Sequence, residues 1–198
     1  MDIQNILDNS DNSLYLDDRI FLEWLRNREL YIDSEIDGYM VQSIVPMIRE
    51  WNREDIGKKN RTPITVFINS IGGNVAAGFS IIDSILLSKT PVKTVNIGRA
   101  YSMGYLIFLA GHIRTAYPNA TYLMHDGQTA VWDSGGKAKD TINFYNRLEE
   151  RIKKYILSRT TMSEEEYDKR IREEVYMFND EALAINAVHS IESRHTSF

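Results

Sequence analysis

A serine lies where a strand-like segment of the sequence gives way to an apolar one. Ser102 belongs to residues 98–104 (GRAYSMG), which follow the alternating residues 92–97 and precede the apolar residues 105–110. These patterns predict a strand before the turn and a helix after it, with Ser102 at the helix N-terminus. Free N–H groups and the helix dipole favour negative charge there, and a serine that attacks a carbonyl creates such an oxyanion. The alternative interpretation is a serine that only caps the helix.

A nucleophilic serine needs a base, and His125 is the candidate. It ends a predicted strand at residues 121–124 and is followed by Asp126 and Gly127. His112 competes for the role, but it lies at the far end of the helix that begins at Ser102, roughly 15 Å away. The assignment of His125 as the base therefore depends on a serine mechanism, since a lone histidine also occurs as a structural residue.

Oxyanion donors are the next requirement, and two adjacent glycines offer one. Gly72 and Gly73 follow the predicted strand at residues 63–69. Paired glycines permit positive φ and let a substrate backbone approach closely, although a tight strand-to-helix turn would explain them equally. Combined with the Ser102 turn, they make the N–H groups of Gly73 and Met103 a candidate donor pair.

The segments that must position these residues alternate between strand and helix patterns. Predicted strands occupy residues 29–33, 63–69 and 92–97, and predicted helices lie within residues 17–28, 37–48, 75–86 and 105–110. This order is typical of βαβ units around a largely parallel sheet, in which ligands bind at the carboxyl edge of the strands. Gly72, Gly73 and Ser102 are all predicted at that edge.

The remaining residues divide into two regions. Residues 1–14 are rich in Asn, Asp and Ser and are predicted to be a mobile arm, which leaves residues 15–198 as a single domain. Short strands are predicted at residues 113–117, 121–124 and 189–191. A long charged helix with an apolar stripe is predicted at residues 138–158, a second from Ser163 to about residue 173, and a third at residues 181–188 capped by Asp180.

Composition limits the kind of protein. The chain has 198 residues, a net charge of -5 and no cysteine. The negative charge argues against a nucleic-acid partner, and the absence of thiols fits a cytoplasmic location. No signal peptide and no apolar run long enough for a membrane span are visible. The histidines show no ligand spacing, so neither a metal nor another cofactor is expected.

Several motifs in this sequence together resemble the ClpP (caseinolytic protease proteolytic subunit) family. They occur in family order from about residue 28 to 191, at residues 67–78 (FINSIGGNVAAG), 81–83, 98–104, 110–111, 118–120, 123–125 and 181–182. The resemblance implies an α/β fold, a ClpP/crotonase-like spiral of βαβ units with residues 138–158 as a protruding handle helix. It also implies a serine endopeptidase that cleaves peptides or unfolded proteins inside homo-oligomeric rings, as a heptamer or tetradecamer, with an AAA+ unfoldase as a partner.

The same resemblance assigns roles to individual residues. Ser102 matches the nucleophile, His125 the general base, and Gly73 and Met103 the oxyanion amides. The family aspartate stands seven residues before the Glu-Ala pair, where this chain has Glu174. Glutamate can orient an imidazole, but its extra methylene requires a different backbone offset. Glu173 and Asp180 are the alternatives for this third position.

The sequence also departs from the family pattern. Ile71 replaces the usual proline, and Asp126 and Gly127 replace the residues that normally follow the histidine in the handle strand. The N-terminal arm lacks the family's axial-loop sequence. Glu174 followed by Val175 and Tyr176 resembles phage head-maturation proteases. The alternatives to a chambered peptidase are therefore a non-catalytic ring subunit, a phage-type maturation protease and a crotonase-type acyl-CoA enzyme.

Overall fold

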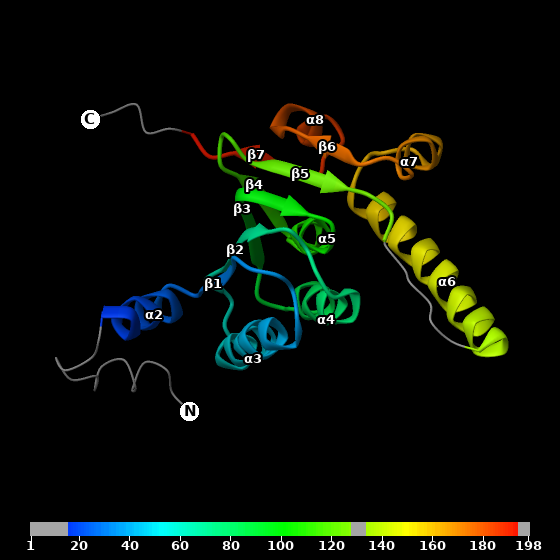
Figure 1. The fold of residues 1–198 in the computed structure, drawn as a ribbon. Coiled ribbons are helices and arrows are strands. Elements are labelled where there is room, and N and C mark those ends of the chain that lie inside the picture. Colours follow the sequence, from blue (N-terminus) through cyan, green and yellow to red (C-terminus); the bar gives the residue numbers. More distant parts are fainter. Residues whose placement is uncertain (1–15, 128–133, 194–198) are drawn as a thin grey trace.

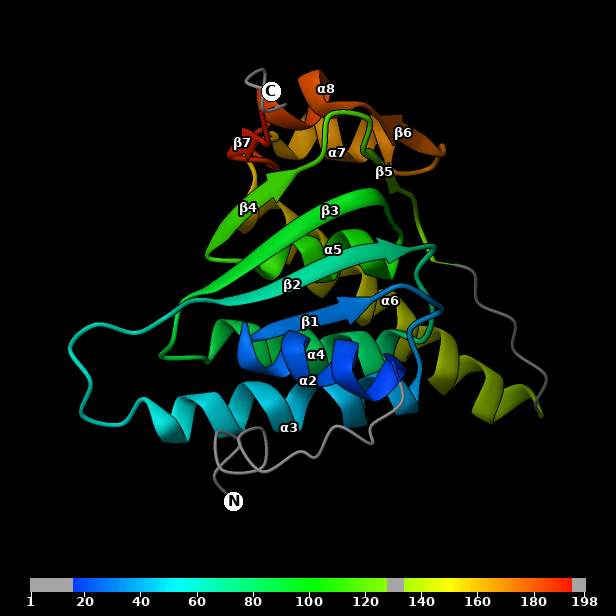
Figure 2. The same cartoon turned by 90° about the vertical axis from the view of Figure 1, so that its left-hand side faces the viewer.

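The chain folds around a twisted sheet with helices on both faces (Figures 1 and 2). The computed structural model describes residues 16–127 and 134–193. In this part of the chain the strands are β1 Glu29–Ile32, β2 Ile64–Ser70, β3 Val92–Tyr101, β4 Ile113–Ala116, β5 Thr121–Met124, β6 Val175–Met177 and β7 Ser190–Ile191. The helices are α2 Leu16–Arg26, α3 Gly38–Glu54, α4 Val75–Leu86, α5 Met103–Ala110, α6 Gly135–Arg159, α7 Glu164–Arg170 and α8 Asn179–Ala184. The predicted α/β class is confirmed.

Strand β3 is the centre of the sheet because it changes neighbours along its length. Strands β1, β2, β3, β4 and β7 form a parallel series. Residues 93–96 of β3 pair with β4, whereas residues 99–101 pair with β5. The sequence predicted a strand that stops at Ile97, but the second partner extends it to Tyr101. As a result, the strand runs directly into Ser102.

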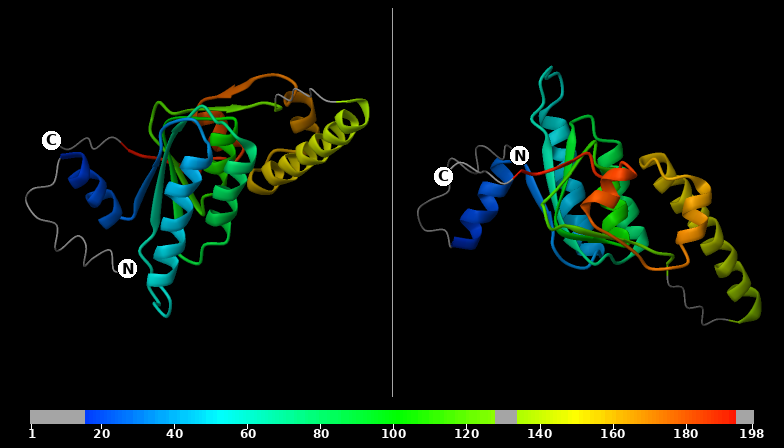
Figure 3. Two further views of the ribbon diagram at one scale, coloured as in Figure 1. Left: turned by 60° about the horizontal axis from the view of Figure 1, so that its bottom comes forward. Right: turned by 90° about the horizontal axis from the view of Figure 1, so that it is seen from above.

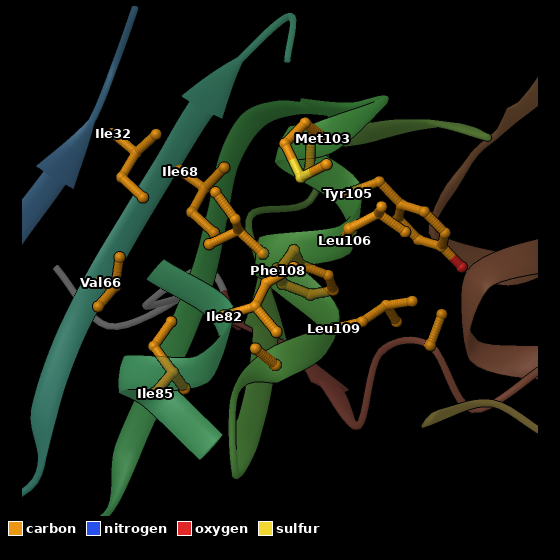
Figure 4. Packing of buried hydrophobic residues seen from close by; sticks show 14 of the residues in the cluster. Ile32, Val66, Ile68, Ile82, Ile85, Met103, Tyr105, Leu106, Phe108 and Leu109 are labelled. Atoms are coloured by element: carbon orange, nitrogen blue, oxygen red, sulfur yellow. The ribbon is translucent and has the colours of Figure 1, made fainter. Parts of the chain in front are cut away.

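The core lies between the sheet and helices α3, α4 and α5. Figure 4 shows Ile82 and Ile85 of α4 and Phe108 of α5 packed in the space beside Val66 and Ile68 of β2. All eight residues of α5 are buried, as its uninterrupted apolar sequence requires. Each fully buried large apolar side chain contributes roughly 1.5–3 kcal/mol, so the helix that begins after Ser102 is firmly held.

The opposite face of the sheet carries α2. Alternate residues of β1 face the two sides, with Leu30 and Ile32 buried in the core. Tyr31 faces away and stacks between Trp24 of α2, at a centroid distance of 4.3 Å, and Phe67 of β2, at 4.8 Å. The predicted helix within residues 17–28 is therefore present and is attached to the sheet by aromatic packing.

Helix α6 extends away from the body, with its C-terminal end attached to α5 (Figure 3). Tyr155 Oη donates to Leu106 O at 2.9 Å, and Arg159 donates to Leu109 O and Gly111 O, both at 2.8 Å. The buried guanidinium of Arg114 donates to carbonyls at the ends of α5, α6 and α8, including Ala187 O at 2.8 Å. Burial lowers the pKa of Arg114 to about 10, and these carbonyl oxygens stabilise its charge. The predicted protruding helix is thus fixed relative to the helix of Ser102.

The C-terminal third differs from the sequence-based expectation in three places. Helix α7 ends at Arg170 instead of continuing to about residue 173, and the short strand β6 was not predicted. The last helix spans Asn179–Ala184 with Phe178 at its N-cap, so the expected cap Asp180 lies inside the first turn. The Phe178 N–H donates to the Glu181 carboxylate, and this bond sets the earlier start. The predicted arm at residues 1–14 lies outside the described residues.

An ion pair anchors the end of α3 to the strands. The Asp55 carboxylate is 1 % exposed and accepts two bonds from Arg28, at 2.7 and 3.0 Å, with a third from Thr90 at 2.8 Å. Lys58 adds a contact at 3.1 Å. The hydrogen bond from Arg28 is the main cause that holds the pKa of Asp55 well below its usual range. This carboxylate therefore stabilises the folded chain only while it is ionised.

We expect Asp55→Asn to lower the free energy of unfolding at pH 7 by about 2–3 kcal/mol, because the half-buried Arg28 loses the nearer of its two carboxylate partners and keeps only Glu54, at 3.1 Å. The folded-state pKa of Asp55 is lowered, so its contribution is full above about pH 5 and declines as pH falls below the unfolded value. Urea unfolding followed by circular dichroism at pH 7 and pH 3 should show the difference shrinking in acid. The exposed Asp33→Asn is the matched control. A constant difference between the two pH values would contradict this account.

Candidate active site

Ser102 is held in a backbone conformation that non-glycine residues rarely adopt. Its φ is 52° and its ψ is -120°, between the end of β3 and the start of α5. Such a conformation costs on the order of 1–3 kcal/mol and persists only where surrounding structure enforces it. Ser102 occupies the N-cap position, yet among the described residues its side chain makes no capping hydrogen bond. The simple helix-cap interpretation therefore does not account for this serine.

The Gly72-Gly73 turn packs directly against Ser102. A Cβ atom on Gly72 would stand 2.8 Å from the Ser102 Cβ and 3.0 Å from the Met103 nitrogen. Gly72 has φ +103°, which independently favours glycine. Its N–H donates to Ser70 Oγ, which in turn donates to Ser34 O. Only glycine permits this close approach, so the turn and the serine form one unit.

The backbone N–H of Gly73 points toward the Ser102 side of the turn. Gly73 forms a parallel bridge with Ile36, in which Ile36 N donates to Gly72 O at 2.9 Å and Asn74 N donates to Ile36 O at 2.7 Å. In this pattern the N–H of the middle residue points away from its bridge partner. Since Ile36 lies on the β1 side, the Gly73 N–H is directed toward the β3 side. The Met103 N–H, in the first turn of α5, also has no partner within its helix.

Strand β5 brings His125 to the same place. The Ser102 N–H donates to Leu123 O at 2.9 Å, and β5 ends one residue later at Met124. His125 directly follows β5 and is half-buried. The strand β5 itself runs toward α6 and α7 (Figure 1). Ser102 and His125 both line one cavity of about 450 Å³. The predicted nucleophile and base are therefore brought together, while His112 is used elsewhere, with its Nδ1 accepting from Val92 N.

This arrangement of strand, strained serine and helix agrees with the comparison to known families. A model of the Clp protease family matches residues 15–194. The chain belongs to the Clp protease family. Membership supports a ClpP-type peptidase, which is a serine peptidase in its general class. The mixed α/β sheet and its helices are consistent with the ClpP fold.

The contacts of Glu174, the candidate third residue of a ClpP-type triad, link it less directly to the cavity than those of Ser102 and His125. Strands β5 and β6 are antiparallel, and their last pair is Met124 with Val175. Extending this register by one position would set Glu174 opposite His125, and opposed residues of an antiparallel pair point to the same face. Glu174 is exposed, however, and its carboxylate accepts a bond from Tyr176 Oη at 3.1 Å. It does not line the cavity of Ser102.

Other carboxylates are present around this Clp protease site. Glu173 and Asp180 are exposed, and neither lines the cavity. Asp126 and Asp168 do line it, although the sequence did not single them out as candidates. Asp126 was visible as the neighbour of His125, but Asp168 reaches the cavity only because α7 folds back beside β5. Asp126 N donates to Ile171 O at 3.1 Å and joins these two segments.

Within residues 16–127 and 134–193, no group of three or more His, Asp or Glu side chains could hold a metal ion. Over the same ranges, no helix is long and apolar enough to cross a membrane.

Proposed function

We propose that the chain is a serine endopeptidase in which Ser102 is the nucleophile and His125 the general base. The observation that supports the proposal most is that Ser102 has a strained backbone, makes no side-chain capping bond among the described residues, and lines the same cavity as His125. His125 takes the Ser102 proton as Oγ attacks the substrate carbonyl. The amides of Gly73 and Met103 stabilise the oxyanion, and each such donor lowers the barrier by about 3 kcal/mol. His125 then gives the proton to the leaving amine, and water hydrolyses the acyl-enzyme.

Reaction with a fluorophosphonate probe tests this assignment. The probe modifies serines whose hydroxyl is activated by a base and faces an oxyanion site. We expect one site of modification, and peptide mapping by mass spectrometry should locate it at Ser102. A folded chain that stays unmodified would favour the alternative of a non-catalytic ring subunit.

The proposal includes assembly into rings, heptamer or tetradecamer, that enclose the sites. Helix α6 supports it, because it extends from the body and exposes Ile142 and Phe144, which are 48 % and 53 % accessible. Apolar side chains on a projecting helix are candidates for contact with another copy. Peptides or unfolded proteins would be the substrates of such a chamber, and an AAA+ unfoldase would deliver folded ones. Light scattering tests the assembly, since a monomer would contradict it.

Glu174 is the proposed orienting carboxylate for His125. We expect Glu174→Gln to lower kcat by roughly ten- to a hundredfold with little change in KM, because the imidazole loses its orientation and its charge partner. The control variants Glu173→Gln and Asp180→Asn should retain activity within about twofold. Steady-state cleavage of a fluorogenic peptide measures both parameters. Full activity in Glu174→Gln would remove this residue from the triad.

A further inference from the structure

The cavity beside Ser102 has an apolar wall suited to a long side chain. Helix α6 presents Ile152 and Ile156, which lie one turn apart on one face. Further apolar side chains from four other segments complete this wall: Val75, Met103, Leu106, Met124 and Ile171. A substrate side chain that enters beside Ser102 would thus have aliphatic contacts along its length.

The same cavity is also rich in carboxylates. Asp126, Glu149, Glu150 and Asp168 line it, against the two cationic side chains of Lys153 and Arg172. Lys153 is already engaged, because its Nζ lies 2.6 Å from Asp168 and 2.8 Å from Glu164. Across residues 16–127 and 134–193, no ion pair joins Asp126, Glu149 or Glu150 to a cationic side chain. Over the same ranges Arg172 is in no ion pair either, so the lining has two more carboxylates than cationic side chains and a net negative charge.

The pKa of Tyr167, in α7, is affected by several of these carboxylates. Its side chain lines the cavity, 5 % of the residue is exposed, and the Lys153 Nζ lies 5.8 Å from its ring centroid. Burial is the largest cause that raises the pKa of Tyr167 to about 12, and the Lys153 charge opposes it. Asp168, Glu149 and Asp126 then raise it further. Carboxylates from α7, α6 and the end of β5 thus act together on one wall of the cavity.

We infer that this cavity selects a Lys or Arg as the acyl-side residue, meaning the residue whose carbonyl Ser102 attacks. The inference rests on the proposed function, since it assigns a substrate class to the same site. Lys and Arg have an apolar stem that fits the wall of Ile152 and Ile156, and a cationic head that the carboxylates attract. A Glu or Asp side chain would meet like charge. A purely aliphatic side chain would use the wall but not the carboxylates.

A peptide series tests the preference. Fluorogenic peptides that differ only at the acyl-side residue, as Lys, Arg, norleucine, Leu or Glu, are compared by kcat/KM with the full chain. Norleucine matches the Lys stem without its charge. We expect Lys and Arg to exceed norleucine by about three- to tenfold at low salt, to lose much of this advantage at 1 M NaCl, and Glu to be slowest. Equal or higher kcat/KM for Leu and norleucine would overturn the inference.

Charge variants of α6 give the second measurement. Glu149→Gln should reduce the Lys-to-norleucine ratio of kcat/KM by about threefold, and Glu149→Lys should raise the Glu-to-norleucine ratio. Asp140→Asn is the matched control, because Asp140 lies on the same helix, is exposed and does not line the cavity. Unchanged ratios in both Glu149 variants would overturn the inference.

Probe labelling distinguishes a failure of the inferred Lys or Arg preference from a failure of the proposed peptidase function. If a fluorophosphonate labels Ser102 but the peptide series favours Leu, the inference fails and the proposed function stands. If Ser102 is not labelled and no peptide is cleaved, the proposed function fails and the inference fails with it.

Discussion

Replacing Ser102 with alanine is expected to lower peptide cleavage by roughly 10⁴- to 10⁶-fold and to abolish fluorophosphonate labelling. Loss of the nucleophile removes the covalent route entirely, and what remains is the effect of substrate binding and the oxyanion amides. The folded structure should survive, because alanine keeps the Cβ atom and the Ser102 hydroxyl makes no capping bond among the described residues. Kinetics with a fluorogenic peptide and probe labelling of the same preparation measure both effects.

A control serine and a glycine variant sharpen this test. Ser80→Ala, on the exposed face of α4, should retain activity within about twofold. Ser102→Gly should be as inactive as Ser102→Ala but more stable by about 1 kcal/mol, because glycine relieves the strain at φ 52°. Cleavage that persists in Ser102→Ala would show that another residue is the nucleophile.

Local patterns predicted most of the elements that hold Ser102. The alternation of residues 92–97 and the apolar run after Ser102 predicted β3 and α5, because both are buried and their sequences carry the period of their structure. The rule that parallel strands end at a common edge predicted Gly72 and Gly73 near Ser102, and the structure places Gly72 directly against it. The family motifs linked His125 to the same site.

The features that sequence did not predict depend on distant partners. Strand β3 continues to Tyr101 because it acquires β5 as a second neighbour, and no residue of the segment itself signals this change. Strand β6 has three residues, too few to show a period, and exists through its pairing with β5. The expected position of Glu174 opposite His125 extends that register by one residue beyond the last recorded pair. The carboxylates of the cavity come from the segment after β5, from α6 and from α7, which only the tertiary fold brings together.

The Gly72-Gly73 turn is the feature that a small substitution should damage most. We expect Gly72→Ala to lower kcat/KM by about 10²- to 10³-fold, because a Cβ there would stand 2.8 Å from the Ser102 Cβ and 3.0 Å from Met103 N. The turn cannot shift freely, since Gly73 is bridged to Ile36 on its other side. Any adjustment therefore moves Ser102 or the oxyanion amides. Kinetics with the fluorogenic peptide and the rate of probe labelling should fall together.

The variant Gly57→Ala separates the effect of pressing a Cβ against Ser102 from the effect of backbone strain alone. Gly57 also has positive φ, at +80°, but a Cβ there would meet no atom within 4 Å. Both variants incur the cost of an alanine at positive φ, about 1 kcal/mol of stability, whereas only Gly72→Ala presses on the serine. Gly57→Ala should thus lose stability yet keep its kcat/KM. Equal activity in the two variants would mean that the Gly72-Gly73 turn does not hold the oxyanion donors, and that Ser102 depends on β5 and α5 alone.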